Sequence, residues 1–182
     1  MDLTFQKIET ERLVLRQLTM DDKEFIFKHF SDPEVCKYFD QEPFSKIEEA
    51  EELICWYENP NKDLWRRWGI VKKDVNILIG TCGYHKWNKK DMRVEIGYDL
   101  YKEYWGNGYM SEALKVLIEY CFINLEVNRI DALTHLENIR SINALNKFGF
   151  KQEGILREYV YCGGRFDDQL SLSLLNREWI AT

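Results

Sequence analysis

The 182-residue sequence predicts one α+β domain over residues 1–182, built on a mixed, mostly antiparallel sheet of about seven strands flanked by about four helices. Two observations predict this class. Three runs rich in β-branched and aromatic residues follow one another in the middle third, separated by polar turns of hairpin length, and such runs form antiparallel strands. A glycine-containing loop then leads into an amphipathic helix and another strand, and a strand–helix–strand connection makes a parallel pair.

The N-terminal third combines one strand with helices. Residues 11–18 alternate apolar and polar side chains, which is typical of a half-buried strand. A Thr-x-x-Asp capping pattern opens a helix over residues 19–30, and Pro33 stands at the favoured first position of a second short helical turn. A capping box then precedes an apolar stripe at helical spacing over residues 45–57, where we expect a further helix.

The rest of the chain supplies the sheet and two more helices. Apolar residues at helical spacing follow the glycine loop as far as Phe122, and a helix over residues 138–148 ends at Gly149. A turn over residues 162–165 contains two glycines and closes a last hairpin. The predicted strands of this part of the chain are residues 65–71, 77–87, 93–100, 129–135, 155–161 and 166–175.

Charge and cysteine content exclude several classes of protein. Acidic residues outnumber basic ones and give a formal net charge of -6 without a basic patch, which argues against a nucleic-acid partner. The cysteines show no C-x-x-C spacing and the histidines are far apart in sequence, so no metal site is expected. The chain shows no signal sequence and no apolar run of membrane-spanning length, and we expect a soluble, cytoplasmic protein with reduced thiols and no membrane contact.

The most informative segment is the loop over residues 104–111, in which Gly106 and Gly108 precede a predicted helix. Glycines allow a sharp turn that presents consecutive backbone amides to one point, and the start of the helix adds N–H groups and the positive end of its dipole. Such a loop can receive a phosphate or pyrophosphate, although an isolated G-x-G is also common in plain turns. No Lys-Ser or Lys-Thr follows, and Ser111 stands where a dinucleotide fingerprint has its third glycine, so both familiar nucleotide motifs are excluded.

Five segments carry a resemblance to one family. They are TERLVLR at residues 10–16, EIGYDL at 95–100 with YWGNGYMSEA at 104–113, NIRS at 138–141 with KFGF at 147–150, EGILR at 153–157, and EW at 178–179. In this order, and over nearly the whole chain, they resemble the GCN5-related N-acetyltransferases (GNAT), and within them the branch that contains the ribosomal-protein N-terminal acetyltransferases. The resemblance implies a GNAT-type sheet of the class predicted above.

The resemblance further implies an enzyme that uses acetyl-CoA as cosubstrate, without a metal, and transfers the acetyl group to a primary amine by direct attack on the thioester. The lower pKa of an α-amino group favours a protein or peptide N-terminus as acceptor over a lysine side chain. A small-molecule amine, such as a polyamine or an aminoglycoside, is the alternative, because an acidic protein attracts any cationic acceptor. A noncatalytic acyl-CoA-binding module is a third reading, from another class.

The resemblance also assigns residues to the cofactor. Asn138 either holds the pantetheine amide or caps its helix, and Lys147 either approaches a phosphate or is an ordinary solvated lysine. The superfamily usually carries Arg or Gln three residues before the first loop glycine, where this chain has Glu103, so we expect Glu103 to face solvent while backbone amides bind the pyrophosphate. The full set of implied cofactor residues is Tyr98, Leu100, Gly106, Asn107, Gly108, Tyr109, Met110, Ser111, Asn138 and Lys147.

Two catalytic residues follow from the same resemblance. Glu95 matches a frequent acid of the family and would remove the proton of the amine, directly or through a water; its alternative is a solvated carboxylate or an ion pair with Arg93 or Lys147. A free N–H in an irregular strand end over residues 98–100 is expected to bind the oxyanion. The tyrosine acid of many members has no counterpart, which leaves Ser141 to protonate the thiolate or, alternatively, to cap its helix.

The hairpin over residues 155–175 is expected to be exposed. Its strands could extend the sheet of a second copy across a two-fold axis, so a homodimer is one expected assembly. The expected partners are therefore acetyl-CoA, an amine acceptor and a second copy of the chain.

Overall fold

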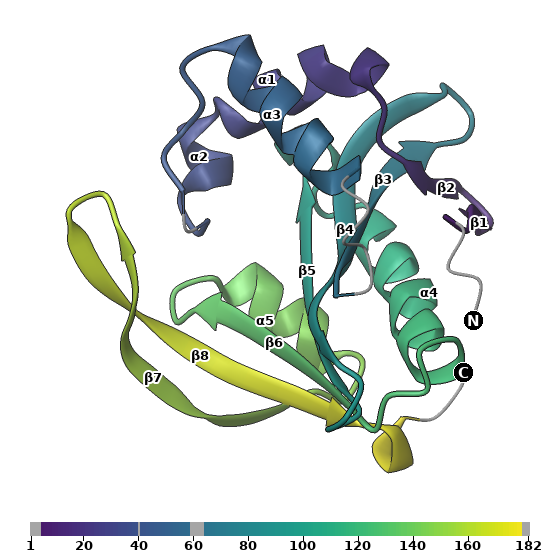
Figure 1. The fold of residues 1–182 in the computed structure, drawn as a ribbon, viewed down its shortest axis with the longest axis vertical. Coiled ribbons are helices and arrows are strands. Elements are labelled where there is room, and N and C mark those ends of the chain that lie inside the picture. Colours follow the sequence, from purple (N-terminus) through teal and green to yellow (C-terminus); the bar gives the residue numbers. More distant parts are fainter. Residues whose placement is uncertain (1–4, 40, 59–63, 180–182) are drawn as a thin grey trace.

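The computed structural model describes residues 5–39, 41–58 and 64–179, which contain one eight-stranded sheet (Figure 1). The strand order is β1-β2-β3-β4-β5-β6-β8-β7. All neighbouring strands are antiparallel except β5 and β6, so the predicted mixed, mostly antiparallel sheet is confirmed. The strands are β1 (Ile8–Glu9), β2 (Leu13–Gln17), β3 (Arg66–Lys72), β4 (Ile77–Asn88), β5 (Arg93–Leu100), β6 (Arg129–His135), β7 (Lys151–Cys162) and β8 (Arg165–Leu175).

The short strand β1 is the one that sequence patterning missed. It pairs with β2, with Ile8 opposite Leu15. Two residues are too few to show an alternation of apolar and polar side chains, so periodicity alone cannot find such a strand.

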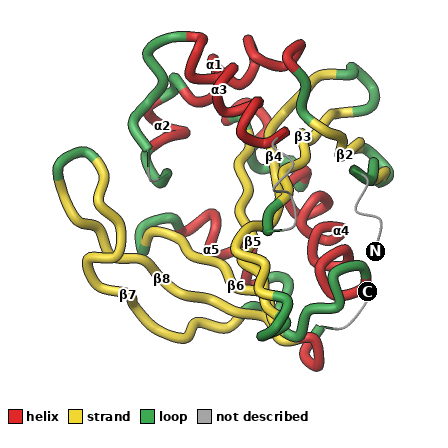
Figure 2. The backbone as a smooth tube through the Cα atoms, in the orientation of Figure 1, coloured by secondary structure: helices red, strands yellow, loops and turns green. Residues whose placement is uncertain are grey.

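The helices lie where the sequence predicts them. The Thr-x-x-Asp segment forms a 3₁₀ turn over Met20–Asp22 that runs into the first helix. Figure 2 shows the first three helices together at one end of the sheet, and contacts place the fourth against β2, β4 and β5. Within the described residues the α-helices are α1 (Lys23–Phe30), α2 (Pro33–Cys36), α3 (Ile47–Glu58), α4 (Tyr109–Ile123) and α5 (Ile139–Asn146).

Alternation along β3 divides the interior into two cores. Ile70 packs in the larger core with α4, whereas Val71 packs in the smaller core with α1 and α3. Burial of each such side chain contributes about 1.5–3 kcal/mol, so the sheet is held from both sides. The buried stripe of α4 has the i, i+3, i+4, i+7 spacing of an amphipathic helix and consists of Leu114, Leu117, Ile118 and Cys121.

Strands β5 and β6 pair only at their beginnings, where residues 93–95 lie opposite residues 129–131. Beyond Glu95 they separate: β5 continues along β4 to Leu100, and β6 continues along β8 to His135 (Figure 1). Within the described chain, β5 therefore has no strand partner on its β6 side beyond Glu95, and its backbone groups there are left for other partners.

The hairpin of β7 and β8 projects from the body of the molecule (Figure 1), and most residues of the edge strand β7 are exposed. Gly163 and Gly164 form its turn, both with positive φ. Addition of a second copy at this edge stays a prediction. No helix of the described chain is long and apolar enough to cross a membrane.

Candidate active site

Two adjoining cavities open where β5 and β6 separate. We call one the strand cavity, of about 420 Å³, because residues of β3, β4, β5 and β6 line it, among them Arg67 and Glu95. The other, of about 440 Å³, is the loop cavity, lined by the glycine loop and by α5. Both have the size of small-molecule sites. The residues that line both cavities, and so mark where two ligands would meet, are Tyr38, Phe39, Tyr98, Asn138 and Ser141.

The glycine loop has the conformation that an anion-binding loop needs. Gly106 and Gly108 have φ values of +77° and +79°, in the left-handed region that glycine adopts without strain. Gly108 is the N-cap of α4, so the first free N–H groups of that helix follow directly. A Cβ on Gly106 would have no atom within 4 Å, so the loop backbone faces open space.

Nine of the ten residues implied for the cofactor line the loop cavity. The exception is Asn107, whose side chain donates to the carbonyl of Trp105 at 3.0 Å. Glu103 is exposed and does not line the cavity, which confirms that it faces solvent. Arg140, which belongs to the NIRS segment but was not assigned to the cofactor, also lines the cavity, with its guanidinium 3.6 Å from the ring centroid of Trp105. The nine lining residues are Tyr98, Leu100, Gly106, Gly108, Tyr109, Met110, Ser111, Asn138 and Lys147.

Arg12 holds the glycine loop from the N-terminal side. Its Nη1 donates to the carbonyl of Asn107 at 3.1 Å, and its Nε donates to Glu112 Oε2 at 2.6 Å. Its guanidinium also lies 4.6 Å from the ring centroid of Tyr109. Thr10 adds a hydroxyl bond to Glu112 at 2.6 Å. The first segment of the family resemblance, residues 10–16, therefore fixes the glycine loop, which belongs to the second segment.

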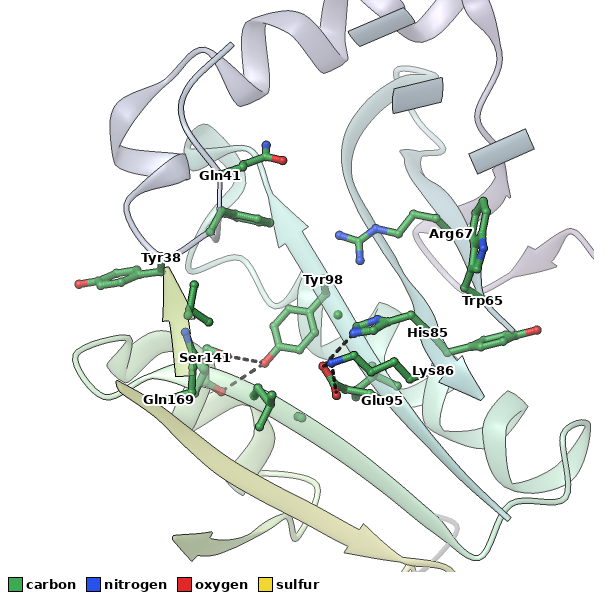
Figure 3. A pocket seen from close by; sticks show the side chains of 18 of the residues that line it. Tyr38, Gln41, Trp65, Arg67, His85, Lys86, Glu95, Tyr98, Ser141 and Gln169 are labelled. Carbon is green, nitrogen blue, oxygen red and sulfur yellow. Dashed lines mark hydrogen bonds and ion pairs between the residues drawn. The ribbon is translucent and has the colours of Figure 1, made fainter. Parts of the chain in front are cut away.

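Glu95 lies in the strand cavity, with its side chain 16% exposed (Figure 3). It binds His85 Nε2 at 2.8 Å and Lys86 Nζ at 3.0 Å, so the alternative of an ion pair with Arg93 or Lys147 was wrong. Burial raises the pKa of Glu95, but the hydrogen bonds and charges of His85 and Lys86 lower it more, and the net shift is downward. Glu95 is therefore an ionised hydrogen-bond acceptor at neutral pH.

A bulge in β4 brings Lys86 to Glu95. The register of β4 against β5 shifts between His85 and Asn88, and Lys86 has a φ of 54°. A non-glycine residue in this region is strained, and bulges redirect side chains near functional sites. Here the bulge directs the ammonium group of Lys86 toward the carboxylate of Glu95.

Tyr98 and Ser141 form a hydroxyl pair between the two cavities. Their oxygens are 2.9 Å apart, and the Ser141 carbonyl, 3.3 Å from the Tyr98 hydroxyl, is a second acceptor within reach of its proton (Figure 3). Burial raises the pKa of Tyr98 to about 12. The phenol therefore keeps its proton at neutral pH and can supply it toward Ser141.

Asn138, and not Ser141, caps α5. Asn138 is the N-cap residue, and its Oδ1 accepts a hydrogen bond from the backbone N–H of Ser141 at 3.2 Å. The capping alternative is thus confirmed for Asn138 and wrong for Ser141, whose hydroxyl is turned to Tyr98.

The irregular strand end expected over residues 98–100 is absent. The pairing of β5 with β4 runs without a shift from Glu95 opposite His85 to Leu100 opposite Gly80. The irregularity lies instead in β4, and the backbone groups of β5 lose their partners because β6 separates from it. An oxyanion donor from residues 98–100 would thus come from a regular strand with one open side.

A buried charge cluster lies beside the site, and sequence patterning did not find it. Asp99 accepts hydrogen bonds from Arg67 Nη2, from Thr81 Oγ1 and, at 2.8 Å, from His29 Nε2. Burial raises the pKa of Asp99, but the charge of Arg67 and the hydrogen bond of His29 lower it to about 2. The described residues contain no cluster of three or more His, Cys, Asp or Glu side chains that could hold a metal ion.

Comparison with known proteins identifies the family. The family model described as an acetyltransferase (GNAT) domain matches residues 12–151 of this chain. The chain belongs to the GNAT acetyltransferase family. An N-acetyltransferase of Bacillus licheniformis named p20 and described as uncharacterized is 39% identical over 175 residues, which cover 96% of this chain and 98% of the relative.

Further relatives differ in the acceptors that their names state. YdaF of Bacillus subtilis, named provisionally as a ribosomal N-acetyltransferase, is 35% identical over 56% of this chain and 56% of its own. A spermidine N(1)-acetyltransferase of Vibrio cholerae is 25% identical over 93% of this chain and 96% of its own.

Solved structures share the fold. A GNAT acetyltransferase from Bacillus anthracis has a TM-score of 0.83 and 26% identity, covering 95% of this chain and 100% of its own. A spermidine N-acetyltransferase from Vibrio cholerae, solved in complex with CoA and spermine, has a TM-score of 0.81 and 24% identity, covering 93% of this chain and 98% of its own.

Replacing Gly106 tests the loop cavity. Gly106→Ala should weaken CoA binding by about tenfold or more, because its methyl group would enter the space beside the loop amides that a pyrophosphate needs. Gly164→Ala is the matched control: Gly164 has a φ of +79° and open space around its Cβ position, but it lies in the β7–β8 turn. Titration calorimetry with CoA should show a loss for the first variant alone, and equal affinities would contradict the loop assignment.

Proposed function

We propose that this protein transfers the acetyl group of acetyl-CoA to the α-amino group of a peptide or protein N-terminus. The observation that carries the choice of acceptor is the charge of the strand cavity. Among the described lining residues, Glu95 is the single carboxylate, whereas Arg66, Arg67 and Lys86 are cationic. A polyamine carries several ammonium groups and would need several carboxylates to replace their hydration, whereas an N-terminus brings one ammonium group.

The loop cavity fits acetyl-CoA, which would supply the acetyl thioester. The open space beside the backbone at Gly106 and the N-terminus of α4 suit the pyrophosphate, and Lys147 and Arg140 line the same cavity with positive charge. Tyr98 and Ser141 line the end of this cavity that joins the strand cavity.

Glu95 is the proposed base. Its carboxylate lies in the strand cavity and would remove the proton of the bound ammonium, directly or through a water. Because its pKa is lowered, Glu95 is a weak base and suits an amine that gives up its proton readily. An α-amino group, with a pKa of about 8, meets this requirement better than a lysine amine, with a pKa of about 10.4.

Ser141 is the proposed proton donor to the departing thiolate. Its hydroxyl lies where the two cavities meet, and the Tyr98 hydroxyl, 2.9 Å away, can replace the proton that Ser141 gives up. The cap of α5 is made by Asn138, so the Ser141 hydroxyl is not required for the helix.

A small-molecule amine acceptor is the second candidate. It is favoured by the spermidine N(1)-acetyltransferase relative, which aligns with 93% of this chain. The two candidates share the loop cavity and differ in what fills the strand cavity.

An acceptor panel separates these candidates. We expect thiol release from acetyl-CoA with short N-terminal peptides at a kcat/KM at least about tenfold above that for spermidine or an aminoglycoside, given the discrimination that one matched charge provides. A faster reaction with spermidine would favour the small-molecule reading. Absence of thiol release with every amine would indicate a noncatalytic acyl-CoA-binding module.

Removing the charge of Glu95 tests the base. Glu95→Gln should lower kcat by about 10²-fold, with the dissociation constant for acetyl-CoA unchanged because Glu95 does not line the loop cavity. The wild-type kcat should fall on acidification only below pH 4.5, the usual pKa of a glutamate, and the variant should lack this decline. Stopped-flow assays across pH measure kcat and its acid decline for both enzymes. A wild-type kcat in the variant would show that Glu95 is not the base.

Paired substitutions in α5 separate catalysis from capping. Asn138→Ala should lower the stability by about 1 kcal/mol through loss of the cap. Ser141→Ala and Tyr98→Phe should leave the melting temperature nearly unchanged and lower the single-turnover rate modestly, by roughly tenfold, because a thiol leaves with only partial proton donation. Thermal melts and single-turnover assays on the same preparations test this. An undiminished rate in Ser141→Ala would leave water as the acid.

A further inference from the structure

Arg67 crosses the sheet over two glycines. In the strand registers, Arg67 of β3 lies opposite Gly83 of β4, and Gly83 lies opposite Gly97 of β5. A Cβ added to Gly97 would lie 3.0 Å from Arg67 Nη1, so the guanidinium occupies the space that a side chain at position 97 would fill. The glycine at this position is therefore what admits Arg67 to β5.

Two of the three guanidinium nitrogens are fixed by the buried cluster. Arg67 Nε donates to Thr81 Oγ1 at 2.7 Å, and Nη2 donates to Asp99. Asp99 is held in turn by His29 and by the Thr81 backbone N–H, at 2.8 Å and 3.1 Å. The Arg67 side chain is 12% exposed and lines the strand cavity (Figure 3). A donor held in this way is oriented before any ligand arrives.

The third nitrogen, Nη1, has no hydrogen-bond partner within the described chain and lies over Gly97. Glu95 is two residues away along β5, on the same face and roughly 7 Å along the strand. An ionised acceptor of hydrogen bonds and a free donor thus lie side by side in one cavity. An α-aminoacyl group has the matching pair, an ammonium and a carbonyl group that are separated by one carbon atom.

We propose that Arg67 Nη1 binds the first carbonyl oxygen of the acceptor peptide, so that the enzyme recognises an α-aminoacyl group and not a bare amine. This inference rests on the proposed function and names the specificity residue of its acceptor site. Asp99 already neutralises the charge of Arg67, so the guanidinium offers a hydrogen bond to a neutral carbonyl and little net attraction to a carboxylate.

Gln41 adds a second donor in the same cavity. Its side-chain Nε2 is buried without a hydrogen-bond partner in the described chain, and Gln41 lines the strand cavity (Figure 3). An unsatisfied buried donor is costly, and a further carbonyl of an extended peptide would satisfy it. A polyamine has only ammonium donors and cannot accept from either residue.

The test replaces one carbonyl of the acceptor. A short N-terminal peptide is compared with its trans-alkene isostere, which keeps the shape and the primary amine but lacks the carbonyl and N–H of the first amide, and rates are compared at equal concentrations of neutral amine. Wild-type enzyme should use the peptide with a kcat/KM about tenfold to hundredfold above that of the isostere, the range for a hydrogen bond to a charged group. Equal use of both acceptors would overturn the proposed contact between Arg67 and the first carbonyl while leaving the proposed function in place. A rate above background with spermidine alone would overturn both.

A variant of Arg67 assigns the preference to its side chain. Arg67→Lys keeps a cation beside Asp99 but removes the forked donor, so the ratio of peptide to isostere kcat/KM should fall to below about threefold. The affinity for acetyl-CoA should be unchanged, since Arg67 does not line the loop cavity. A wild-type ratio in the folded variant would overturn the assignment to Arg67. The comparison of the two acceptors needs only wild-type enzyme and decides the carbonyl contact even if the variant does not fold.

Discussion

The early end of pairing between β5 and β6 is the constraint on which the rest of the site depends. Each strand keeps its partner on the other side, β4 for β5 and β8 for β6, so both stay fixed while the space between them opens. Glu95 is the last paired residue, and Tyr98 follows in the separated part. If the pairing of β5 and β6 continued to Leu100, backbone hydrogen bonds would occupy the gap between the two strands beside which the cavities meet.

Charges within the site are balanced locally. Glu95 pairs with Lys86 and His85, and Asp99 pairs with Arg67. Removing one partner of the buried Asp99–Arg67 pair leaves an uncompensated charge, which costs about 3–5 kcal/mol, so these two positions resist change for stability. The balance leaves Glu95 as the single carboxylate to receive an ammonium group among the described lining residues, and hydrogen-bond direction selects what adjoins that group.

Local chemistry made part of this molecule predictable. The sharp turn at Gly106 and Gly108 could be predicted because glycine by itself tolerates a φ near +80°. The apolar stripe of α4 could be predicted because its spacing follows the period of the helix. Arg67 and Asp99 gave no such signal, since they are 32 residues apart and meet only through strand registers. For the same reason the sequence did not predict Lys86 as a partner of Glu95: the bulge that turns Lys86 toward it depends on how β4 pairs.

Under the proposed function, the residues shared by the two cavities would couple acetyl-CoA and the acceptor thermodynamically. Tyr38, Tyr98 and Ser141 line both cavities, so a ligand in either one restricts side chains that the other must also contact. By linkage, the factor by which the occupant of the loop cavity changes the affinity of the strand cavity equals the factor in the reverse direction. A substitution at this junction therefore changes a cooperativity that belongs to the pair of sites, and its effect on either affinity depends on whether the other site is filled.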